Sequence, residues 1–313
     1  MAKDIIIGID AGTSIIKAVA FTLNGKEITT SSIANIYKTS KNGHATQPLD
    51  TTWENCIKII TDISKKIQNL KNRLALISIT GQGDGTWLID KEGNPVCDAW
   101  LWLDARSSEI AKGLTNLESE NSRFNATGTA IFAGQQSAQI SYMEKNNPEI
   151  LNKSTTAFHC KDWIYYKLTN IRATDPSEAC FTFGNFKTKN YDKSVINNLG
   201  LSKRTNLLPD IIDGSKITHP LVNEAADLLG LLSGTPVSLA YIDAVCTFLG
   251  SGGLDLNKNV GTSILGTTSA HMKASKIKDI TPNINLKSGY VMLLPIDNFA
   301  LQLQTSMSGT LNI

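Results

Sequence analysis

The first part of the chain alternates short apolar runs with polar turns. Ile5–Ile9 is rich in β-branched side chains, and a second such run, Ile15–Phe21, follows after a polar turn. The second run has no helical spacing, so the pattern predicts two strands joined by a tight turn. Asn24-Gly25 is the strongest short hairpin signal, and it leads to a third predicted strand at Glu27–Ile33. We therefore expect an antiparallel group of strands at the start.

Helical spacing appears next. Asp50–Lys71 carries one apolar stripe, and Thr51 with Glu54 fits a capping box at its start. A buried strand is expected at Leu74–Thr80. Further elements are a short strand at Thr86–Asp90 and helices at Ser107–Leu117, Gln135–Asn146 and Lys161–Leu168. Because strands and helices alternate after the opening group, we predict an α/β fold with a mixed sheet flanked by helices.

A change of composition separates a second, shorter block. Leu199–Pro220 is rich in Gly, Pro, Asp and Ser and is expected to be a connecting region. It is followed by a predicted helix at Asn223–Leu232, strands at Pro236–Ala240 and Val260–Gly266, a helix after Asp243, and at Leu301–Ile313 a strand and the opening of a helix. We expect two domains, residues 1–235 and 236–313, with the second incomplete and the chain the front portion of a longer protein.

An incomplete second domain would leave apolar side chains uncovered. We therefore expect exposed apolar surface in Val260–Ile313, at Ile264, Leu265, Leu293, Leu294 and Leu301. Such a surface and an unpaired strand edge invite association, so a homodimer is an expected possibility.

Composition narrows the classes of function. The formal net charge of the 313 residues is +2 and the lysines are scattered, which indicates neither a nucleic-acid surface nor a membrane patch. No apolar run approaches membrane-spanning length, and the N-terminus goes straight into a strand instead of a signal peptide. The five cysteines form no C-x-x-C pair, and the four histidines show no ligand spacing. We expect free thiols, structural histidines and a cytoplasmic location.

The turn between the first two predicted strands is the first candidate site. Gly12 lets the backbone approach an anion closely, and the N–H groups of Gly12, Thr13 and Ser14 can surround a phosphate. Asp10, at the strand end, is placed to hold a cation or an ordered water beside it. The alternative is a hairpin in which Asp10 and Gly12 only form the turn. A dinucleotide-binding turn should open a helix, and the P-loop pattern G-x-x-x-x-G-K-[ST] does not occur.

Three other polar clusters follow predicted strands. Gln82 and Asp84 lie in a loop with three glycines and offer hydrogen-bonding groups to hydroxyls. The segment 100–106 places tryptophans beside Asp104 and Arg106, which is typical of sites for polyhydroxy ligands. Its alternative is core tryptophans with a surface ion pair. Asp243, at the junction of the two blocks, is placed for a base in a cleft, or else caps a helix N-terminus.

Taken together, these segments resemble the FGGY family of carbohydrate and polyol kinases, within the actin/hexokinase-like superfamily. The resemblance covers essentially the whole chain and rests on IDAGTSIIKAV, ITGQGDGTWLID, LWLDARS, YIDAV and LGTTSAH, in that order. The segments GQGDGTWLIDKEGNP and QTSMSGTLNI are most similar to the erythritol kinase branch, with xylulose-type kinases close by. The resemblance implies a ribonuclease H-like, two-domain fold.

The resemblance also implies ATP-dependent phosphoryl transfer to a hydroxyl of a small polyol or sugar, with Mg²⁺. Asp10 would organise the metal, and Asp243 would take the proton from the attacking hydroxyl. The nucleotide phosphates would contact Gly12, Thr13, Ser14 and Lys17 from the first domain and Gly266, Thr267 and Thr268 from the second. The sugar pocket would be lined by Gln82, Asp84, Trp102 and Asp104, with Arg106 in support and Phe132 as an apolar wall.

Two departures from the family pattern bear on substrate and nucleotide. Gly83-Asp84 stands where xylulose-type relatives carry a histidine or another bulky side chain, which favours an erythritol-like C4 or C5 polyol over a pentulose. Nothing corresponds to the family's adenine-binding segment, so we expect this chain to bind ATP poorly. A pentulose kinase and a non-catalytic carbohydrate-binding relative are the alternatives. A phosphatase of the same superfamily fits less well, because the expected pocket suits a sugar acceptor.

Overall fold

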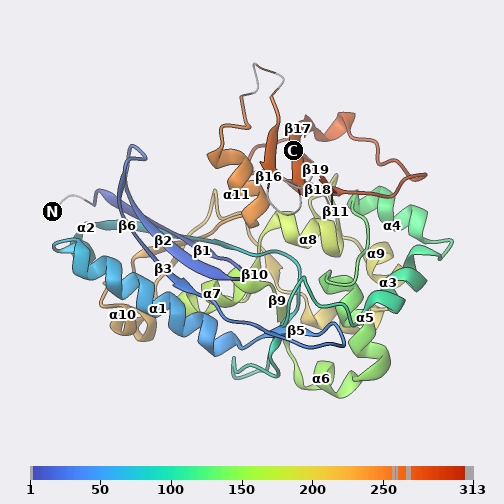
Figure 1. Cartoon of the computed structure of the whole chain (residues 1–313), viewed down its shortest axis with the longest axis horizontal. Helices are drawn as coiled ribbons and strands as arrows, with labels where there is room; N and C mark the ends of the chain where they lie inside the picture. The colour runs from blue at the N-terminus through green and yellow to red at the C-terminus, as the bar shows by residue number, and fades with distance from the viewer. Residues whose placement is uncertain (1–2, 256–257, 259, 266–268, 307–313) are drawn as a thin grey trace.

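The computed structural model describes residues 3–255, 258, 260–265 and 269–306. Within them, a larger body holds a mixed sheet, and a smaller antiparallel sheet lies above it in Figure 1. The α-helices are α1 (Leu49–Lys66), α2 (Leu70–Arg73), α3 (Ser108–Thr115), α4 (Glu120–Thr127), α5 (Gln136–Asn146), α6 (Pro148–Lys153), α7 (Cys160–Thr169), α8 (Pro176–Thr182), α9 (Lys193–Asn198), α10 (Asn223–Leu229) and α11 (Asp243–Gly250). Within the described residues, 3₁₀ helices span Ser202–Leu207 and Ile277–Asp279.

The larger body is built on a sheet whose described strands run in the order β14-β15-β6-β1-β2-β3. β1 pairs in parallel with β6 and antiparallel with β2, and β6 also pairs in parallel with β15. This is the expected mixed sheet. Its strands are β1 (Ile5–Ala11), β2 (Ile15–Thr22), β3 (Glu27–Ala34), β6 (Leu74–Gly81), β14 (His219–Pro220) and β15 (Pro236–Leu239).

Shorter strands pair around this sheet. β4 (Lys38–Thr39), β5 (Ala45–Gln47) and β8 (Ala99–Trp100) form one small sheet. The pairs are β7 (Trp87–Ile89) with β9 (Thr156–Phe158), β10 (Ala173–Thr174) with β13 (Asp210–Ile211), and β11 (Gly184–Asn185) with β12 (Asn190–Tyr191).

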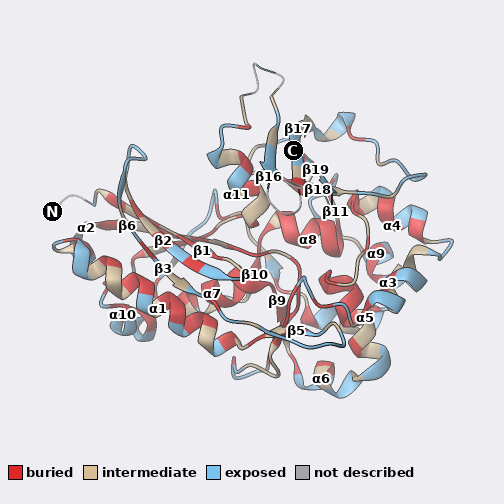
Figure 2. Cartoon of the chain, viewed as in Figure 1, coloured by how far each residue is buried: buried red, intermediate tan, exposed pale blue. Residues whose placement is uncertain are grey.

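One face of the large sheet is the main core. Ile5, Ile7 and Ile9 of β1 are fully buried, and α1, α7 and α10 cover this face. Figure 2 shows the buried residues gathered between helices and sheet, with the outer side of α1 exposed. Because side chains alternate across a strand, Asp10 lies on the opposite face, and it is exposed. The alternation of β1 therefore turns a carboxylate away from the core at the end of the strand.

The expected helix at Asp50–Lys71 is two elements. α1 begins at Leu49 after Pro48, and no side chain caps it, so the predicted capping box at Thr51 is wrong. The helix ends at Lys66, Ile67 is extended, and Asn69 has a φ of 57° before the short α2. Ile67 and Leu70 nevertheless stay buried, which is why the apolar spacing continued across the break.

The smaller body is the antiparallel sheet β16-β17-β19-β18, with β16 (Thr262–Leu265), β17 (Ser269–Lys276), β18 (Tyr290–Leu293) and β19 (Phe299–Ser306). Ile264 and Leu265 are exposed by 40% and 53%, as expected. The same expectation is wrong for Leu293, Leu294 and Leu301, which are buried. These three pack in one cluster with side chains of α8 and α11, so the two bodies share a core. The predicted helix opening after residue 306 lies outside the described residues.

The five cysteines are free, as expected. Cys56 of α1 and Cys160 of α7 are fully buried in the main core, and the Cys160 thiol donates to the Ala11 carbonyl oxygen at 3.5 Å. No helix in the described part of the chain is long and apolar enough to cross a membrane.

Candidate active site

Two carboxylates from distant parts of the sequence meet at one end of the large sheet. Asp10 near the end of β1 lies beside Thr80 of β6 in the parallel register. The Thr80 hydroxyl donates to the Tyr241 carbonyl oxygen at 2.7 Å, which fixes the segment that leads into α11. Asp243 is the first residue of that helix. Thr80 therefore links the strand that carries Asp10 to the helix that carries Asp243.

The charge of Asp10 affects the titration of Asp243. Burial, followed by the negative charge of Asp10, raises the pKa of Asp243 to about 7, against the opposing effect of the Ala244 N–H, which donates to Asp243 Oδ1 at 2.7 Å. Desolvation by the surrounding protein also raises the pKa of Asp10, although its side chain is partly open to solvent, and the cross-strand Lys17 opposes this. The N-cap of α11 is Ile242, so Asp243 does not cap the helix. A carboxylate with a pKa near neutrality suits a general base.

The turn between β1 and β2 is held by hydrogen bonds from other elements. The Thr13 hydroxyl donates to Gln82 Oε1 at 2.9 Å and accepts from Trp102 Nε1 at 3.0 Å. Asn35 Nδ2 donates to the Gly12 carbonyl oxygen at 3.0 Å. A Cβ on Gly12 would lie 2.7 Å from the Ile15 carbonyl oxygen, so the turn requires glycine. The structure thus brings Thr13, Gln82 and Trp102 together, as expected for one site.

Some supporting residues of this turn had no signal in the sequence. Gln82 Nε2 donates to Gln47 Oε1 at 3.0 Å, and Gln47 Nε2 donates to the Thr13 carbonyl oxygen at 3.3 Å. Gln47 and Asn35 come from short polar stretches that sequence analysis did not single out. Ser14 and Lys17, by contrast, are exposed on the open side of the hairpin.

The loop after β6 holds Asp84 in an unusual environment. Asp84 has a φ of 54° and is 7% exposed, and its Oδ1 has no hydrogen-bond partner among the described residues. Burial and the negative charge of Glu178 raise its pKa well above the ordinary range. This shift favours the neutral acid relative to an exposed carboxyl, and a neutral carboxyl both donates to and accepts from a hydroxyl.

An aromatic group lies over this loop. The Tyr290 ring, from β18, packs edge-on against Phe132 and Phe181, with ring centroids 6.2 and 5.7 Å apart. Burial raises the pKa of Tyr290, and so does its side-chain interaction with Asp84. Phe132 was expected as an apolar wall. Tyr290 was missed because its nearness to Asp84 depends on how the two bodies pack, which no local pattern records.

The predicted aromatic and charged segment divides into two parts. Asp104 is 1% exposed, and its oxygens accept from the Ala45 N–H at 2.8 Å and from Arg106 Nη2 at 2.6 Å. The Arg106 guanidinium lies 3.3 Å from the centre of the buried Trp100 ring. Asp104 and Arg106 therefore form a largely buried pair that shapes the loop. Trp102 is 43% exposed, and this leaves part of its ring open to a ligand.

A fully buried ionic cluster lies behind the loop. Lys161 Nζ lies 2.7 Å from Asp162 Oδ1, 2.8 Å from Asp175 Oδ1 and 2.6 Å from Glu178 Oε2. His159 Nδ1 lies 3.2 Å from Asp162 Oδ2. Burial alone would raise the pKa of Asp162, but Lys161 and His159 lower it to about 2. We name these five residues the buried cluster.

The buried cluster is not a metal site. The ligand atoms of His159, Asp162 and Glu178 lie within 4.8 Å of one another, which is a spacing that could hold an ion. However, the Lys161 ammonium already contacts two of these three side chains. A metal ion would have to displace a buried positive charge, so Lys161 is the cation of this cluster.

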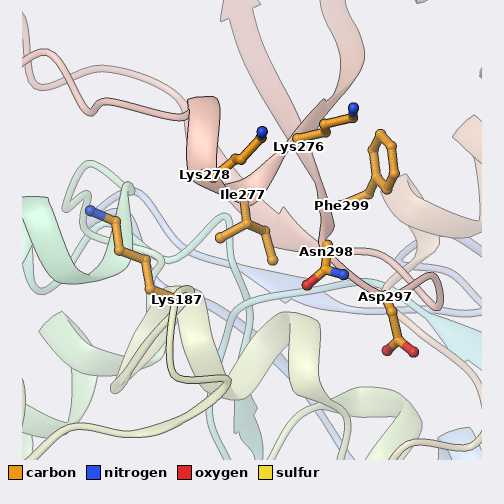
Figure 3. Close-up of a pocket in the computed structure, with 7 residues that line it drawn as sticks. All are labelled: Lys187, Lys276, Ile277, Lys278, Asp297, Asn298 and Phe299. Carbon is orange, nitrogen blue, oxygen red and sulfur yellow. The ribbon is translucent and has the colours of Figure 1, made fainter.

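A cavity of about 640 Å³ lies away from all of these groups. It is lined by Lys187, Lys276, Ile277, Lys278, Asp297, Asn298 and Phe299. Figure 3 shows that the three ammonium groups point in different directions and do not converge. We therefore do not assign it to the site.

Comparison with known proteins identifies the family. The sequence profile for the N-terminal domain of the FGGY family of carbohydrate kinases matches residues 5–250. The chain belongs to the FGGY family of carbohydrate kinases. It is 50% identical to an erythritol kinase of Brucella abortus (strain 2308) over 310 residues, which are 99% of this chain and 59% of that protein. It is 29% identical to a probable L-xylulose kinase of Haemophilus influenzae over 249 residues, 78% of this chain and 50% of that protein.

Solved structures of a xylulose kinase and a glycerol kinase share this fold. A xylulose kinase from Rhodospirillum rubrum matches with a TM-score of 0.89 at 18% identity, over 98% of this chain and 61% of that one. A Plasmodium falciparum glycerol kinase with ADP matches with a TM-score of 0.82 at 18% identity, over 99% of this chain and 62% of that one. The expected family and fold are confirmed. The chain spans 59% of the length of the Brucella abortus relative.

Some expectations about FGGY residues are not tested. Gly266, Thr267 and Thr268 lie outside the described residues. The domain division after residue 235 also stays a prediction. Two observations bear on it: β15 (Pro236–Leu239) pairs with β6 in the first sheet, and the N-terminal FGGY match extends to residue 250.

Proposed function

We propose that the protein containing this chain transfers the γ-phosphoryl group of ATP to a hydroxyl of a small polyol, with an erythritol-like C4 or C5 polyol favoured. The observation that carries the proposal is Asp243, a carboxylate with its pKa raised to about 7 beside a second carboxylate, Asp10. The 50% identity to an erythritol kinase supports this class of acceptor.

Asp243 is the proposed base. Its carboxylate would accept the proton of the attacking hydroxyl as the polyol oxygen bonds to the γ-phosphorus and the bond to the departing ADP oxygen breaks. At neutral pH a group with a pKa of about 7 is ionised in a substantial fraction of molecules and is still basic enough to take the proton. Phosphoryl transfer otherwise depends mainly on positioning and charge neutralisation.

The residues present fit Mg²⁺ and the phosphates of ATP. Asp10 offers carboxylate oxygens, which this hard cation prefers, and its charge raises the pKa of Asp243. When bound, the ion would neutralise charge that develops on the phosphate oxygens. The backbone N–H groups of the Gly12–Ser14 turn and the exposed Lys17 would bind the phosphates. The exposed side of the hairpin leaves them accessible.

The polyol would lie between Trp102 and Asp84. Asp84 offers a carboxyl oxygen without a partner among the described residues, and Tyr290 interacts with the same side chain. The partly open Trp102 ring would cover the C–H face of the chain of carbinol carbons. The Thr13 hydroxyl contacts both Gln82 and Trp102, and it thereby links this side of the polyol pocket to the Gly12–Ser14 turn. Asp104 and Arg106 would act on the polyol by shaping this loop.

A pentulose is the second candidate acceptor, and the 29% identity to a probable L-xylulose kinase favours it. A coupled assay of ADP release over a panel of tetritols, pentitols and pentuloses tests both. We expect ADP release to depend on the polyol and to be greatest with erythritol. Release that prefers a pentulose would favour the second candidate. Polyol binding without any release would favour a non-catalytic carbohydrate-binding protein.

Replacing Trp102 by alanine is expected to weaken polyol binding roughly three- to tenfold, because the variant loses the apolar contact of the ring. Trp102→Phe keeps an aromatic face and loses only the Nε1–H that donates to Thr13 at 3.0 Å, so it should retain most of the affinity. Isothermal titration with erythritol measures both, and nucleotide affinity should barely change. Unaltered polyol affinity in Trp102→Ala would remove Trp102 from the pocket.

A further inference from the structure

The first turn of α8 bonds to both halves of the proposed site. Glu178 Oε1 accepts from the Asp84 N–H at 3.0 Å. The neighbouring Ser177 Oγ accepts from the Ile242 N–H at 3.3 Å, and Ile242 directly precedes Asp243. Two adjacent residues of one helix therefore hold the loop that carries Asp84 and the segment that carries the proposed base. In Figure 1, α8 lies centrally, next to β18 of the smaller sheet.

The two segments held by α8 also touch each other. A Cβ built on Gly83 would lie 2.0 Å from Ile242 Cδ1 and 3.2 Å from Glu178 Oε1. No side chain fits at this point while Ile242 keeps its rotamer. The distance between the polyol loop and the base is therefore set by direct packing and by the two hydrogen bonds to α8.

The Glu178 carboxylate is fixed by a charge on its other side. Its Oε2 lies 2.6 Å from Lys161 Nζ, which also lies 2.8 Å from Asp175 Oδ1. Asp175 Oδ2 in turn accepts from the Ser177 N–H at 2.7 Å. Glu178, Lys161 and Asp175 are fully buried. Each carboxylate thus accepts a backbone N–H with one oxygen and forms an ion pair with the Lys161 ammonium through the other.

We propose that Glu178 is a positioning residue that fixes the Gly83–Asp84 loop against the segment bearing Asp243, with Lys161 as the cation that holds it. This inference rests on the polyol kinase function proposed above. It assigns Glu178 no contact with polyol, nucleotide or metal. Its contribution is the orientation of the Asp84 backbone, which has a φ of 54° and would relax without an acceptor for its N–H.

The chemistry of Glu178→Gln makes the inference testable. Glutamine keeps the volume of the side chain but has only one oxygen acceptor. Either the Asp84 N–H or the Lys161 ammonium must then face an NH₂ group. We therefore expect the Gly83–Asp84 loop to loosen and polyol binding to weaken, with a larger effect on KM than on kcat.

Glu120→Gln is the matched control. Glu120 and Arg123 form another buried ion pair, 2.7 Å apart, on α4, and neither residue bonds to a proposed site residue in the described part of the chain. This control loses a buried charge pair without touching Asp84 or Asp243. Both variants should lower the midpoint of urea unfolding, so stability alone does not separate them.

The experiment measures erythritol binding by titration calorimetry, and kcat and KM for erythritol, for wild type, Glu178→Gln and Glu120→Gln. We expect Glu178→Gln to weaken erythritol binding at least tenfold and to raise KM by a larger factor than it lowers kcat. Glu120→Gln should leave all three unchanged. Ser177→Ala, which loses the bond to Ile242, should lower kcat more than it weakens binding.

A folded Glu178→Gln variant that binds erythritol as tightly as wild type, with an unchanged KM, would overturn the inference. Equal losses in Glu178→Gln and Glu120→Gln would overturn it as well, because they would reflect general destabilisation. Failure of the wild type to bind or phosphorylate any polyol would instead count against the proposed function. The two failures are therefore distinguishable.

Discussion

Replacing Asp243 by asparagine is expected to lower kcat by about 10²–10⁴ while polyol affinity stays nearly unchanged. The amide cannot accept the proton of the attacking hydroxyl, but it keeps the size of the side chain. The Ala244 N–H that donates to Asp243 Oδ1 at 2.7 Å can still be satisfied by the amide oxygen. The loss should therefore fall on the chemical step.

The same residue should set the acid limb of the pH profile. Protonated Asp243 cannot act as a base, so kcat/KM should rise with pH and level off above the pKa of about 7. The limb should disappear in Asp243→Asn. Asp227→Asn, at an exposed position on α10, is the control and should behave as wild type. A comparable loss of binding and of rate in Asp243→Asn would make Asp243 a residue that positions the polyol.

Replacing Lys161 by methionine is expected to lower the free energy of unfolding by about 3–5 kcal/mol, because buried carboxylates lose their cation. Lys161 lies within 2.8 Å of Asp162, Asp175 and Glu178, and all four side chains are fully buried. The cluster also raises the pKa of Lys161 well above its ordinary value, so the folded protein binds this proton tightly. Urea unfolding measures the change.

A control variant and a double variant test this prediction further. Lys112→Met, at an exposed position on α3, should change stability by less than about 0.5 kcal/mol. Adding Glu178→Gln to Lys161→Met removes one of the unpaired negative charges, so the double variant should be more stable than the sum of the single effects implies. A loss of less than about 1 kcal/mol in Lys161→Met would show that the carboxylates are neutral in the folded protein.

The elements that depend on local periodicity could be predicted from the sequence. The β1–β2 hairpin and β6 were found because β-branched runs and turn residues specify them without help from the rest of the chain. The sequence singled out Asp10 and Asp243 because Asp10 lies near the end of a predicted strand and Asp243 begins a predicted helix; their roles stay predictions. The charge of Asp10 is one cause of the raised pKa of Asp243, which agrees with placing the two carboxylates in one site.

What depends on packing between distant segments could not be predicted. α8 is a short helix with no distinct apolar stripe, so nothing in the local pattern indicated that Glu178 contacts Asp84 and Lys161. Leu293 and Leu301 were predicted to be exposed, because the sequence does not show that α8 and α11 cover them. The break after Lys66 could not be seen for a similar reason. Ile67, just past the end of α1, and Leu70, at the start of α2, are both buried, so the apolar spacing continues across the break.

The buried thiols make the opening of the main core measurable by alkylation. Reagents attack the thiolate, and burial raises the pKa of both Cys56 and Cys160, which are inaccessible in the folded chain. Cys160 can react only when α7 moves off the sheet, which breaks its contact with the Ala11 carbonyl one residue after Asp10. The labelling rate at Cys160 therefore measures how often the layer directly behind the Gly12–Ser14 turn opens. Burial also raises the pKa of Cys97 and Cys246, to about 11, but both are partly exposed and serve as references that react without movement of α7.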